Sequence, residues 1–285
     1  MNVALIGLGE VGRVLAEDLA GGCALSAWDT AFATSDSRAA RNARELPVRV
    51  ATGAADAVQS AELVFSAVTA ANDLSAAGDV ATDIARGAWF VDLNSSSPTQ
   101  KQEAAALIDA AGGRYVEAAV MSPIFPLRIG APILLGGPHA TDFVNAARGL
   151  GFSGAQFYAP SVGPAAATKL CRSVVVKGLE ALLMESMLTA RTWGVEKQVL
   201  DSLSNLLPGA DWTEVAEYMI RRSIEHGERR SEEMVEAAST VNDANVDPLM
   251  ATATARRQAW ADNHRAALKA EDLGSLLDAI LVDRT

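Results

Sequence analysis

Three glycines close to the N-terminus have the spacing of a phosphate-binding turn. They follow the apolar run Val3–Ile6 and open a predicted helix over Glu10–Ala20. The first glycine permits a tight turn, the second lets a pyrophosphate approach the backbone, and the third lets helix and strand pack closely. The positive end of the helix favours the same negative charge. We therefore predict a dinucleotide cradle in the segment Gly7-Leu8-Gly9-Glu10-Val11-Gly12.

Asp29 ends the next apolar run, about 20 residues after the first glycine. A carboxylate in this place accepts hydrogen bonds from the ribose hydroxyls of an adenosine. It also repels a 2′-phosphate, so it favours NAD over NADP. Three arginines follow and are able to clamp such a phosphate, which leaves NADP open: Arg38, Arg41 and Arg44.

A run of polar residues follows a later apolar segment, in Asp92-Leu93-Asn94-Ser95-Ser96-Ser97-Pro98. A strand that ends here places these side chains at the carboxyl edge of a sheet, where ligands bind in open α/β folds. Ser97 before Pro98 is a good helix N-cap, with proline at the first helical position. Capping accounts for one serine, so we expect the others to face a ligand.

Lys169 stands on the first turns of a long, mostly apolar predicted helix, after the small residues of Gly163-Pro164-Ala165-Ala166-Ala167. Partial burial among such neighbours lowers the pKa of an ammonium group toward the range useful for proton transfer. The alternative is that the side chain extends to solvent along its own stem. His139 and His264 lack partners at metal-ligand spacing, so we expect no metal site.

Short apolar runs alternate with alanine-rich amphipathic segments over the first half of the chain. The predicted strands are Val3–Ile6, Ala24–Trp28, Val48–Val50, Leu63–Ala67, Trp89–Leu93 and Tyr115–Val120, with Pro132–Leu135 and Gln156–Tyr158 extending the sheet. The predicted helices are Glu10–Ala20, Ala54–Ser60, Asp73–Ala85 and Thr99–Ala111. Continuous apolar strands between helices predict a parallel sheet that is covered on both faces.

The pattern changes after Pro160, where apolar residues recur at helical spacing for about thirty residues and no strand is evident. The predicted fold class is therefore α/β followed by all-α. We expect a Rossmann-type, doubly wound dinucleotide-binding domain over residues 1–160 and a helical substrate and dimerisation domain over residues 161–285.

Composition excludes several classes of protein. The net charge is −11, from 24 Lys and Arg against 35 Asp and Glu, so we expect no nucleic-acid partner. Two cysteines are too few for a disulfide framework and indicate a reducing compartment. The N-terminus lacks the positive region of a signal peptide, and charged residues interrupt the longest apolar stretch. The sequence predicts a cytoplasmic protein with no membrane contact.

The chain resembles the β-hydroxyacid dehydrogenases, and within them the 6-phosphogluconate dehydrogenase-like oxidoreductases. The resemblance rests on the three glycines, the loop Asp92–Pro98, the motif Glu117-Ala-Ala-Val-Met121-Ser122 and the segment Gly163–Lys169. The residues that follow Lys169 are similar to those of a subgroup with a distinctive helical C-terminal domain.

The resemblance implies roles for several residues. It places Ser95 between nicotinamide and substrate, with Ser96 beside it, and makes Lys169 the general acid/base. Val68 and Thr69 fall where the family contacts the cofactor. Ser173, one helical turn after Lys169, takes the position of a family asparagine.

Departures from the family bear on the substrate. Met121 and Ser122 lie in the loop that normally binds a substrate carboxylate, but the two family glycines there are replaced by Ser122 and Pro123. Arg172 and Lys177 add positive charge close to Lys169. We therefore expect an anionic small-molecule substrate, with phosphorylated and sugar-derived hydroxy acids among the candidates.

The sequence therefore predicts an NAD(P)-dependent oxidoreductase that interconverts a hydroxy acid and its keto or semialdehyde form. Imine reductases and reductive aminases share the fold but generally lack this lysine. A catalytically silent dinucleotide sensor is the alternative outside the enzymes. The apolar surface of the long helix predicts a homodimer.

Overall fold

The computed structural model describes residues 1–203, 205 and 209–282. The chain divides into two compact units, residues 1–169 and residues 170–285. The helix Pro164–Trp193 (α7) runs through this division. The domain bounds expected from the sequence, 1–160 and 161–285, remain a prediction.

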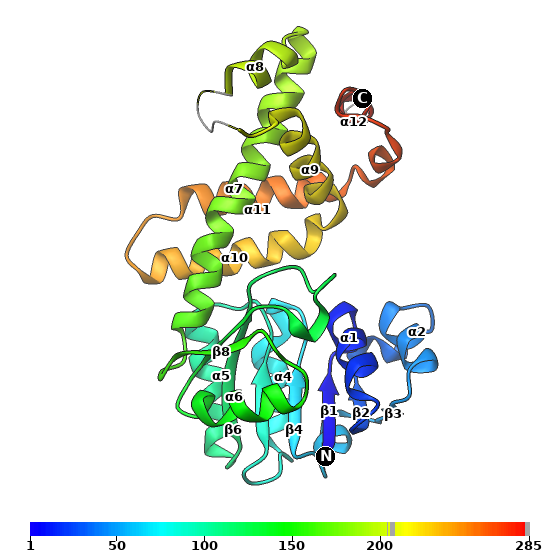
Figure 1. The fold of residues 1–285 in the computed structure, drawn as a ribbon, viewed down its shortest axis with the longest axis vertical. Helices are drawn as coiled ribbons and strands as arrows, with labels where there is room; N and C mark the ends of the chain where they lie inside the picture. Colours follow the sequence, from blue (N-terminus) through cyan, green and yellow to red (C-terminus); the bar gives the residue numbers. More distant parts are fainter. Residues whose placement is uncertain (204, 206–208, 283–285) are drawn as a thin grey trace. The chain divides into compact units, whose positions relative to one another are not determined.

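The first unit is built on one eight-stranded sheet (Figure 1). The strands lie in the order β3-β2-β1-β4-β5-β6-β7-β8. Their bounds are Asn2–Ile6 (β1), Ala24–Trp28 (β2), Arg49–Val50 (β3), Leu63–Ser66 (β4), Trp89–Asp92 (β5), Arg114–Val120 (β6), Ile133–Gly136 (β7) and Ala155–Ala159 (β8). The predicted Rossmann-type sheet is confirmed.

One strand pair departs from the expected parallel arrangement. β6 and β7 are antiparallel, with Val120 opposite Ile133, whereas every other pair in the sheet is parallel. A parallel neighbour needs a long crossover connection, usually with a helix. The segment 121–132 holds only the short 3₁₀ helix Arg128–Gly130 (η3), so the chain turns back beside the strand that it has just left.

Helices cover both faces of the sheet (Figure 1). On one face lie Glu10–Leu19 (α1), Arg38–Glu45 (α2) and Ala140–Gly149 (α6), and on the other lie Ala54–Val58 (α3), Asp73–Ala81 (α4) and Pro98–Ala110 (α5). Two further 3₁₀ helices are Thr30–Ala33 (η1) and Ala70–Asn72 (η2). The sequence patterns did not predict α2 and α6.

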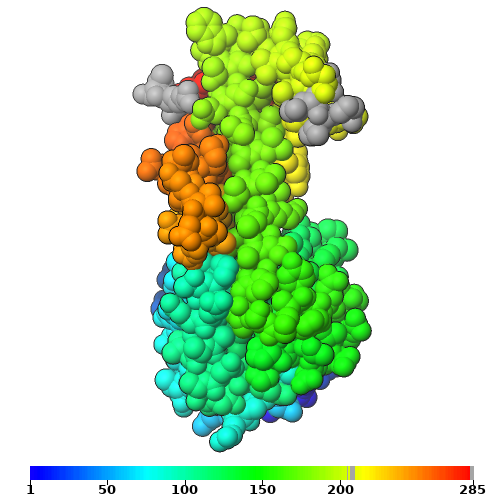
Figure 2. All heavy atoms as spheres, turned by 90° about the vertical axis from the view of Figure 1, so that its left-hand side faces the viewer, coloured from blue at the N-terminus to red at the C-terminus, as the bar shows by residue number. Residues whose placement is uncertain are grey.

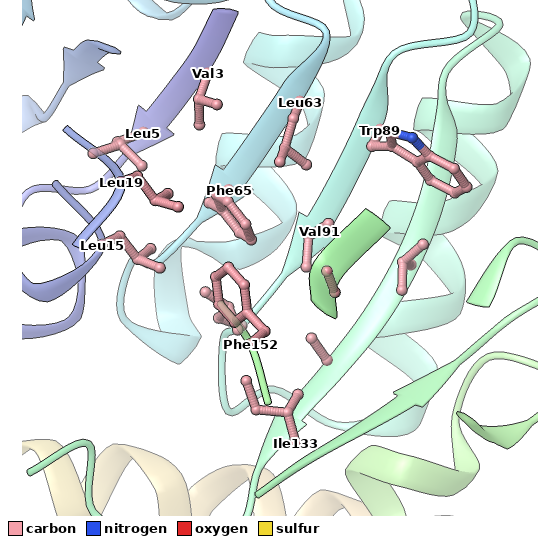
Figure 3. Close-up of a cluster of buried hydrophobic side chains, with 14 of the residues drawn as sticks. Val3, Leu5, Leu15, Leu19, Leu63, Phe65, Trp89, Val91, Ile133 and Phe152 are labelled. Carbon is pink, nitrogen blue, oxygen red and sulfur yellow. The ribbon is translucent and has the colours of Figure 1, made fainter. Parts of the chain in front are cut away.

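Alternate residues of each strand pack against opposite helix layers. Val3 and Leu5 join the core under α1, where Phe65 and Phe152 stack with ring centroids 5.4 Å apart (Figure 3). Ala4 and Ile6 enter the core on the other face. This alternation follows from the two-residue period of a strand, and it explains why the strands read as continuous apolar runs.

The second unit is helical throughout the residues that the structure describes. Besides α7 it contains Glu196–Leu203 (α8), Trp212–Glu225 (α9), Gly227–Asp243 (α10), Leu249–Asp262 (α11), the 3₁₀ helix Arg265–Lys269 (η4) and Leu273–Val282 (α12). Leu170 on α7 packs with Met234 of α10 and with Ala251 of α11, and the orange surface of α11 lies beside α7 in Figure 2. The long predicted helix is confirmed.

Within residues 1–203, 205 and 209–282, no helix has both the length and the apolar character that crossing a membrane requires.

Candidate functional site

The glycine-rich turn connects β1 to α1 and leaves open space at one position only. Gly7 has φ +93°, and a Cβ added there would lie 2.4 Å from the carbonyl oxygen of Ala67. A Cβ on Gly12 would lie 2.1 Å from the carbonyl oxygen of Gly7, whereas one on Gly9 would meet nothing within 4 Å. Gly7 and Gly12 therefore serve backbone packing, and the space beside Gly9 fits a pyrophosphate at the start of α1.

Two polar side chains hold this turn in shape. The Asp29 carboxylate accepts the N–H groups of Leu8 and Ala31, each at 2.8 Å. Asn42 of α2 donates to the carbonyl oxygens of Leu8, at 2.8 Å, and Gly9, at 3.1 Å. The Leu8 N–H is thus taken by Asp29, and the contact of Leu8 with a cofactor stays a prediction. Each Asp29 oxygen keeps a second lone pair, so the carboxylate remains able to accept a ribose hydroxyl.

The three arginines lie on the exposed side of α2. Arg38 pairs with Glu10 at 3.7 Å, and Arg44 donates to the carbonyl oxygen of Ser35 at 3.2 Å. Arg41 donates to the carbonyl oxygen of Asp36. Each arginine thus already contacts a neighbouring group, and binding of a 2′-phosphate by these side chains stays a prediction.

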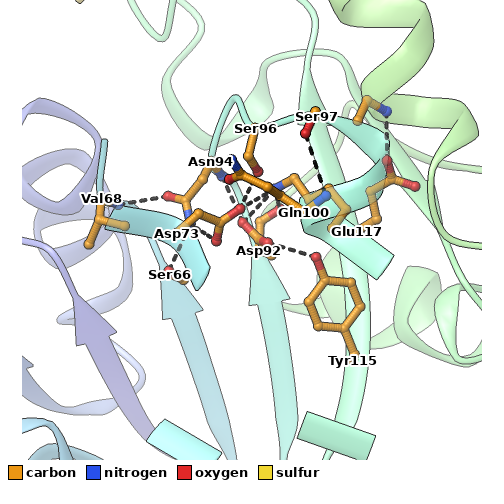
Figure 4. Close-up of polar contacts among 12 residues, drawn as sticks. Ser66, Val68, Asp73, Asp92, Asn94, Ser96, Ser97, Gln100, Tyr115 and Glu117 are labelled. Atoms are coloured by element: carbon orange, nitrogen blue, oxygen red, sulfur yellow. Dashed lines mark hydrogen bonds and ion pairs between the residues drawn. The ribbon is translucent and has the colours of Figure 1, made fainter. Parts of the chain in front are cut away.

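A buried polar centre lies beneath the serine loop, at the carboxyl ends of β4 and β5 (Figure 4). It consists of Ser66, Asp73, Asp92, Asn94, Ser96, Lys101 and Tyr115. Lys101, only 1% exposed, holds its Nζ 2.5 Å from Asp92 Oδ1 and 3.6 Å from Asp73 Oδ2. The Tyr115 hydroxyl donates to Asp92 Oδ2 at 2.6 Å.

The polar centre holds the side chains of Asn94 and Ser96 in the serine loop. Asn94 donates to Asp73 at 2.7 Å and to Ser66 at 2.9 Å, and it accepts the Val68 N–H at 2.7 Å. Ser96 donates to Asp73 and is fully buried, so its expected contact with substrate does not fit the structure.

Ser97 caps α5 as predicted, because its hydroxyl accepts the Gln100 N–H. Ser95 is the residue of the loop that stays half-buried at the surface. Among residues 94–97, the structure thus leaves Ser95 for a ligand.

Burial and charge together set the protonation of the polar centre. Burial, aided by the negative charge of Asp73, raises the pKa of Asp92 to about 7 although Lys101 opposes the shift. Burial lowers the pKa of Lys101, but the attraction of Asp73 and Asp92 outweighs it and raises that pKa overall. Burial raises the pKa of Tyr115 well above its ordinary value, so its hydroxyl stays a donor.

Lys169 is half-buried on α7, at the end of the first unit. The first turn of α7 is bonded to β6, because the buried carboxylate of Glu117 accepts the N–H groups of Gly163 and Ala166. Figure 4 shows Glu117 beside the polar centre. Glu117 pairs in register with Asp92, the last residue of β5. The loop of Ser95 therefore follows one of two paired residues, and the first turn of the helix of Lys169 is bonded to the other.

Three further residues predicted to contact cofactor or substrate lie in loops of the first unit: Thr69, Met121 and Ser122. Thr69 is exposed, and its hydroxyl accepts from the side-chain amide of Asn72 at 2.9 Å. Met121 is half-buried against Ala165, and the half-buried Ser122 donates to the carbonyl oxygen of Pro123 at 3.0 Å.

On α7, Arg172 is exposed and Ser173 is buried. Lys177 is 6% exposed and pairs with Glu233 of α10, while its ammonium also donates to Ser173 at 3.4 Å. Burial lowers the pKa of Lys177 against the opposing attraction of Glu233. Lys177 is therefore engaged within the second unit, and its contact with substrate stays a prediction.

The sequence analysis assigned no role to four side chains that shape the candidate site: Asp73, Lys101, Tyr115 and Glu117. Lys101 shares a helix face with Ala104, Ala105 and Ile108, and this spacing places it on the buried side. Glu117 stands inside an otherwise apolar strand. Both patterns are signals of a buried, partnered charge.

Comparisons with known proteins agree with this geometry. Residues 2–155 match the family described as the NAD binding domain of 6-phosphogluconate dehydrogenase. Residues 190–261 match a domain of unknown function, DUF1932. A conserved hypothetical protein from Sinorhizobium meliloti 1021 is 32% identical, with a TM-score of 0.74 over 98% of this chain and 95% of that one.

Two more distant proteins share most of their length with this chain. An uncharacterised 28.5 kDa protein of Methanothermus fervidus is 25% identical over 256 residues, which are 89% of this chain and 96% of that protein. A 3-hydroxyisobutyrate dehydrogenase of Mycobacterium tuberculosis has the same fold, at 19% identity and a TM-score of 0.73 over 100% of this chain and 99% of that one. The chain thus belongs to the family described as the NAD binding domain of 6-phosphogluconate dehydrogenase.

Proposed function

We propose that this protein interconverts a hydroxy acid and its keto or semialdehyde form, with Lys169 as the acid/base and a nicotinamide dinucleotide as the redox partner. The observation that carries the proposal is the pairing of Asp92 with Glu117. This pair brings the loop that presents Ser95 and the helix that carries Lys169 to one edge of the sheet, where the glycine cradle also opens.

The residues of the cradle fit the dinucleotide that the family implies. The open space at Gly9 and the start of α1 suit the pyrophosphate, and Asp29 suits the adenosine ribose. When bound, the nicotinamide supplies the acceptor or donor for a hydride. We propose NAD as the natural partner because the Asp29 carboxylate repels a 2′-phosphate, and the arginines of α2 make NADP the alternative outcome.

Lys169 moves the proton of the reaction. In oxidation its neutral amine accepts the proton of the substrate hydroxyl, and in reduction its ammonium donates a proton to the forming alcohol oxygen. Ser95, with its half-buried hydroxyl, is the proposed partner that orients the reacting oxygen. Oxidation therefore needs a deprotonated Lys169, and its rate should rise with pH.

The substrate is proposed to be an anionic hydroxy acid. Arg172 follows Lys169 by three residues on α7, so the two side chains share one side of the helix. Arg172 is exposed and therefore able to meet an anion. Ser122, Met121 and Ser173 remain predicted contacts.

The test is a substrate screen followed by removal of the lysine. Plain and phosphorylated sugar acids and small hydroxy acids are assayed with each coenzyme at the absorbance band of the reduced nicotinamide. Lys169→Ala should lower kcat at least about a hundredfold, the usual order for loss of an acid/base group, with little change in coenzyme affinity.

Other outcomes of the screen would replace the proposal. Full activity in Lys169→Ala would remove the mechanism. Turnover of a cyclic imine but of no hydroxy acid would identify an imine reductase or reductive aminase. Coenzyme binding without turnover of any compound would identify a silent dinucleotide sensor.

We also propose that the protein is a homodimer. Large apolar side chains are exposed along α7 in the second unit, among them Val175, Leu182 and Trp193, which is 77% exposed. Large apolar side chains exposed on one helix suit a protein–protein contact, which would remove them from water.

A further inference from the structure

The carboxylate of Glu117 is buried inside the sheet and completely committed to α7. Glu117 is fully buried in the middle of β6. Its Oε2 accepts the Gly163 N–H at 2.9 Å, and its Oε1 accepts the Ala166 N–H at 2.6 Å. A buried charge with these two bonds is stabilised by the positive end of the helix.

These two bonds are those of a helix capping box. In such a box one side chain accepts the N–H of the third helical residue, and another accepts the N–H of the N-cap residue. Here Gly163 precedes Pro164, the first residue of α7, and so Ala166 is the third. Gly163 has no side chain that can cap, so one residue of a neighbouring strand supplies both acceptors.

The neighbouring strand is shaped around this carboxylate. Gly136 of β7 lies opposite Glu117, and a Cβ added there would lie 2.4 Å from Glu117 Oε2. Gly136 thus leaves the space that the carboxylate fills. On the other side Gln102 of α5 donates to the carbonyl oxygen of Val162 at 3.1 Å and fixes the chain just before the helix.

Lys169 follows Ala166 by three residues, less than one turn of helix. The direction in which the Lys169 side chain leaves the helix therefore depends on how the first turn is rotated about the helix axis. Ala165 and Ala166 are buried, so that turn is held against the sheet by packing as well as by Glu117.

We propose that Glu117 is a positioning residue, which fixes the first turn of α7 and through it the place of the Lys169 amine. This inference rests on the proposed role of Lys169. Without both bonds, packing alone holds the first turn and its position is less well fixed. An error of about 1 Å in the place of a catalytic group lowers a rate by up to about a hundredfold.

The test uses Glu117→Gln, which keeps the size of the side chain but leaves only one oxygen to accept. Because one of the two N–H groups then faces an amide nitrogen, amide hydrogen exchange over residues 163–169 should become faster. In the same protein kcat should fall about ten- to a hundredfold. The dissociation constant of the coenzyme should change by less than about twofold, because the cradle at Gly7–Gly12 is untouched.

Asp211→Ala is the control at a helix start outside the proposed site. The Oδ1 atom of Asp211 accepts the N–H groups of Thr213, at 2.9 Å, and Glu214, at 3.1 Å, at the start of α9, and Asp211 has no part in the proposed site. Its replacement by alanine removes this acceptor, so exchange over residues 211–214 should become faster while kcat stays unchanged. An equal loss of kcat in Asp211→Ala would show a general weakening and overturn the inference.

A double-mutant cycle separates positioning from a general loss of structure. In a Lys169→Ala background, Glu117→Gln should lower the residual rate by less than about twofold, because the group that it positions is already gone. A tenfold further loss would mean that Glu117 acts independently of Lys169. Normal activity of Lys169→Ala would instead refute the proposed function itself, so the two failures are distinguishable.

Gly136→Ala serves if Glu117→Gln does not fold. The added methyl displaces the same carboxylate while leaving its charge in place, so kcat and exchange over residues 163–169 should change in the same directions. Wild-type values for both measurements in a folded Gly136→Ala protein would overturn the inference.

Discussion

At the scale of single residues, the polar centre and the cap of α5 together explain why the serine loop offers one hydroxyl and not three. The sequence predicted correctly that Ser97 caps a helix, and it placed Ser95 and Ser96 together at a ligand. The sequence cannot tell which of these two serines is buried, because burial of Ser96 depends on its bond to Asp73. Asp73 lies on α4, far from the serine loop in the sequence. The same holds for Lys177, whose partner Glu233 lies 56 residues away.

Lys101 is the cation of a centre that holds two carboxylates, so its loss should be costly. Lys101→Met leaves Asp92 and Asp73 buried beside each other without a counter-charge, and the free energy of unfolding should fall by about 3–5 kcal/mol. Urea unfolding measures this change. Lys197→Met is the matched control, because the pair Lys197–Asp201 is exposed and worth about 0–1 kcal/mol. Equal effects of the two substitutions would contradict the description of the polar centre.

The protonation of Asp92 should appear in the pH dependence of stability. Its pKa is about 7 in the folded protein, against about 3.9 in an unfolded chain. Between these values the folded protein holds a proton that the unfolded chain has released. The free energy of unfolding should therefore fall as pH rises from about 4 to 7, by at most about 1.4 kcal/mol per pH unit from this group.

Asp92→Asn isolates that contribution. The difference in unfolding free energy between the wild type and Asp92→Asn, measured in urea across this range, should decrease as pH rises. A difference independent of pH would show that Asp92 is ionised throughout.

At the scale of elements, apolar patterning located each strand of the sheet but not every helix. The charged segment Arg38–Glu45 has no apolar run to mark it, although Ser37 caps it. α6 starts after His139 without a side-chain cap, so it lacks the usual start signal. The predicted helix over Asp73–Ala85 ends at Ala81. Apolar patterning could not predict that β7 runs antiparallel to β6, because this reversal depends on the length and shape of the connection between the two strands.

Replacement by alanine should have opposite effects on stability at two glycines that lie in helices. A Cβ on Gly12 would press on the carbonyl of Gly7 and force α1 away from β1, so Gly12→Ala should destabilise the protein by about 1–3 kcal/mol. Gly78 of α4 has nothing within 4 Å of an added Cβ, so Gly78→Ala should stabilise it by about 0.5–1 kcal/mol. Thermal unfolding of both variants measures the difference. A Gly12→Ala protein as stable as the wild type would contradict the packing role of the third glycine.

At the scale of the whole molecule, composition and motif order predicted an α/β part followed by a helical part, and the family comparison agrees. The sequence did not predict which charged residues are paired inside the second unit. Glu180 and Arg230 form a buried pair between α7 and α10, and Gln258 of α11 donates to the same Glu180 at 3.1 Å. The exposed residues of α7 are mixed: the apolar Val175, Leu182 and Trp193 lie on the same helix as the exposed polar residues Arg172 and Glu185.

The exposed apolar side chains of α7 should lie in the contact of the proposed homodimer. Leu182 is 56% exposed on α7, so Leu182→Glu should change the stability of a single chain by no more than about 0.5 kcal/mol. In a dimer contact, however, it would bury an unpaired carboxylate, and so sedimentation equilibrium at micromolar concentration should show the wild type as a dimer and Leu182→Glu as a monomer. Val50→Glu makes the same change at a 49% exposed residue of β3 and should remain a dimer. A wild-type protein that sediments as a monomer would refute the dimer, and a dimeric Leu182→Glu would place the contact elsewhere.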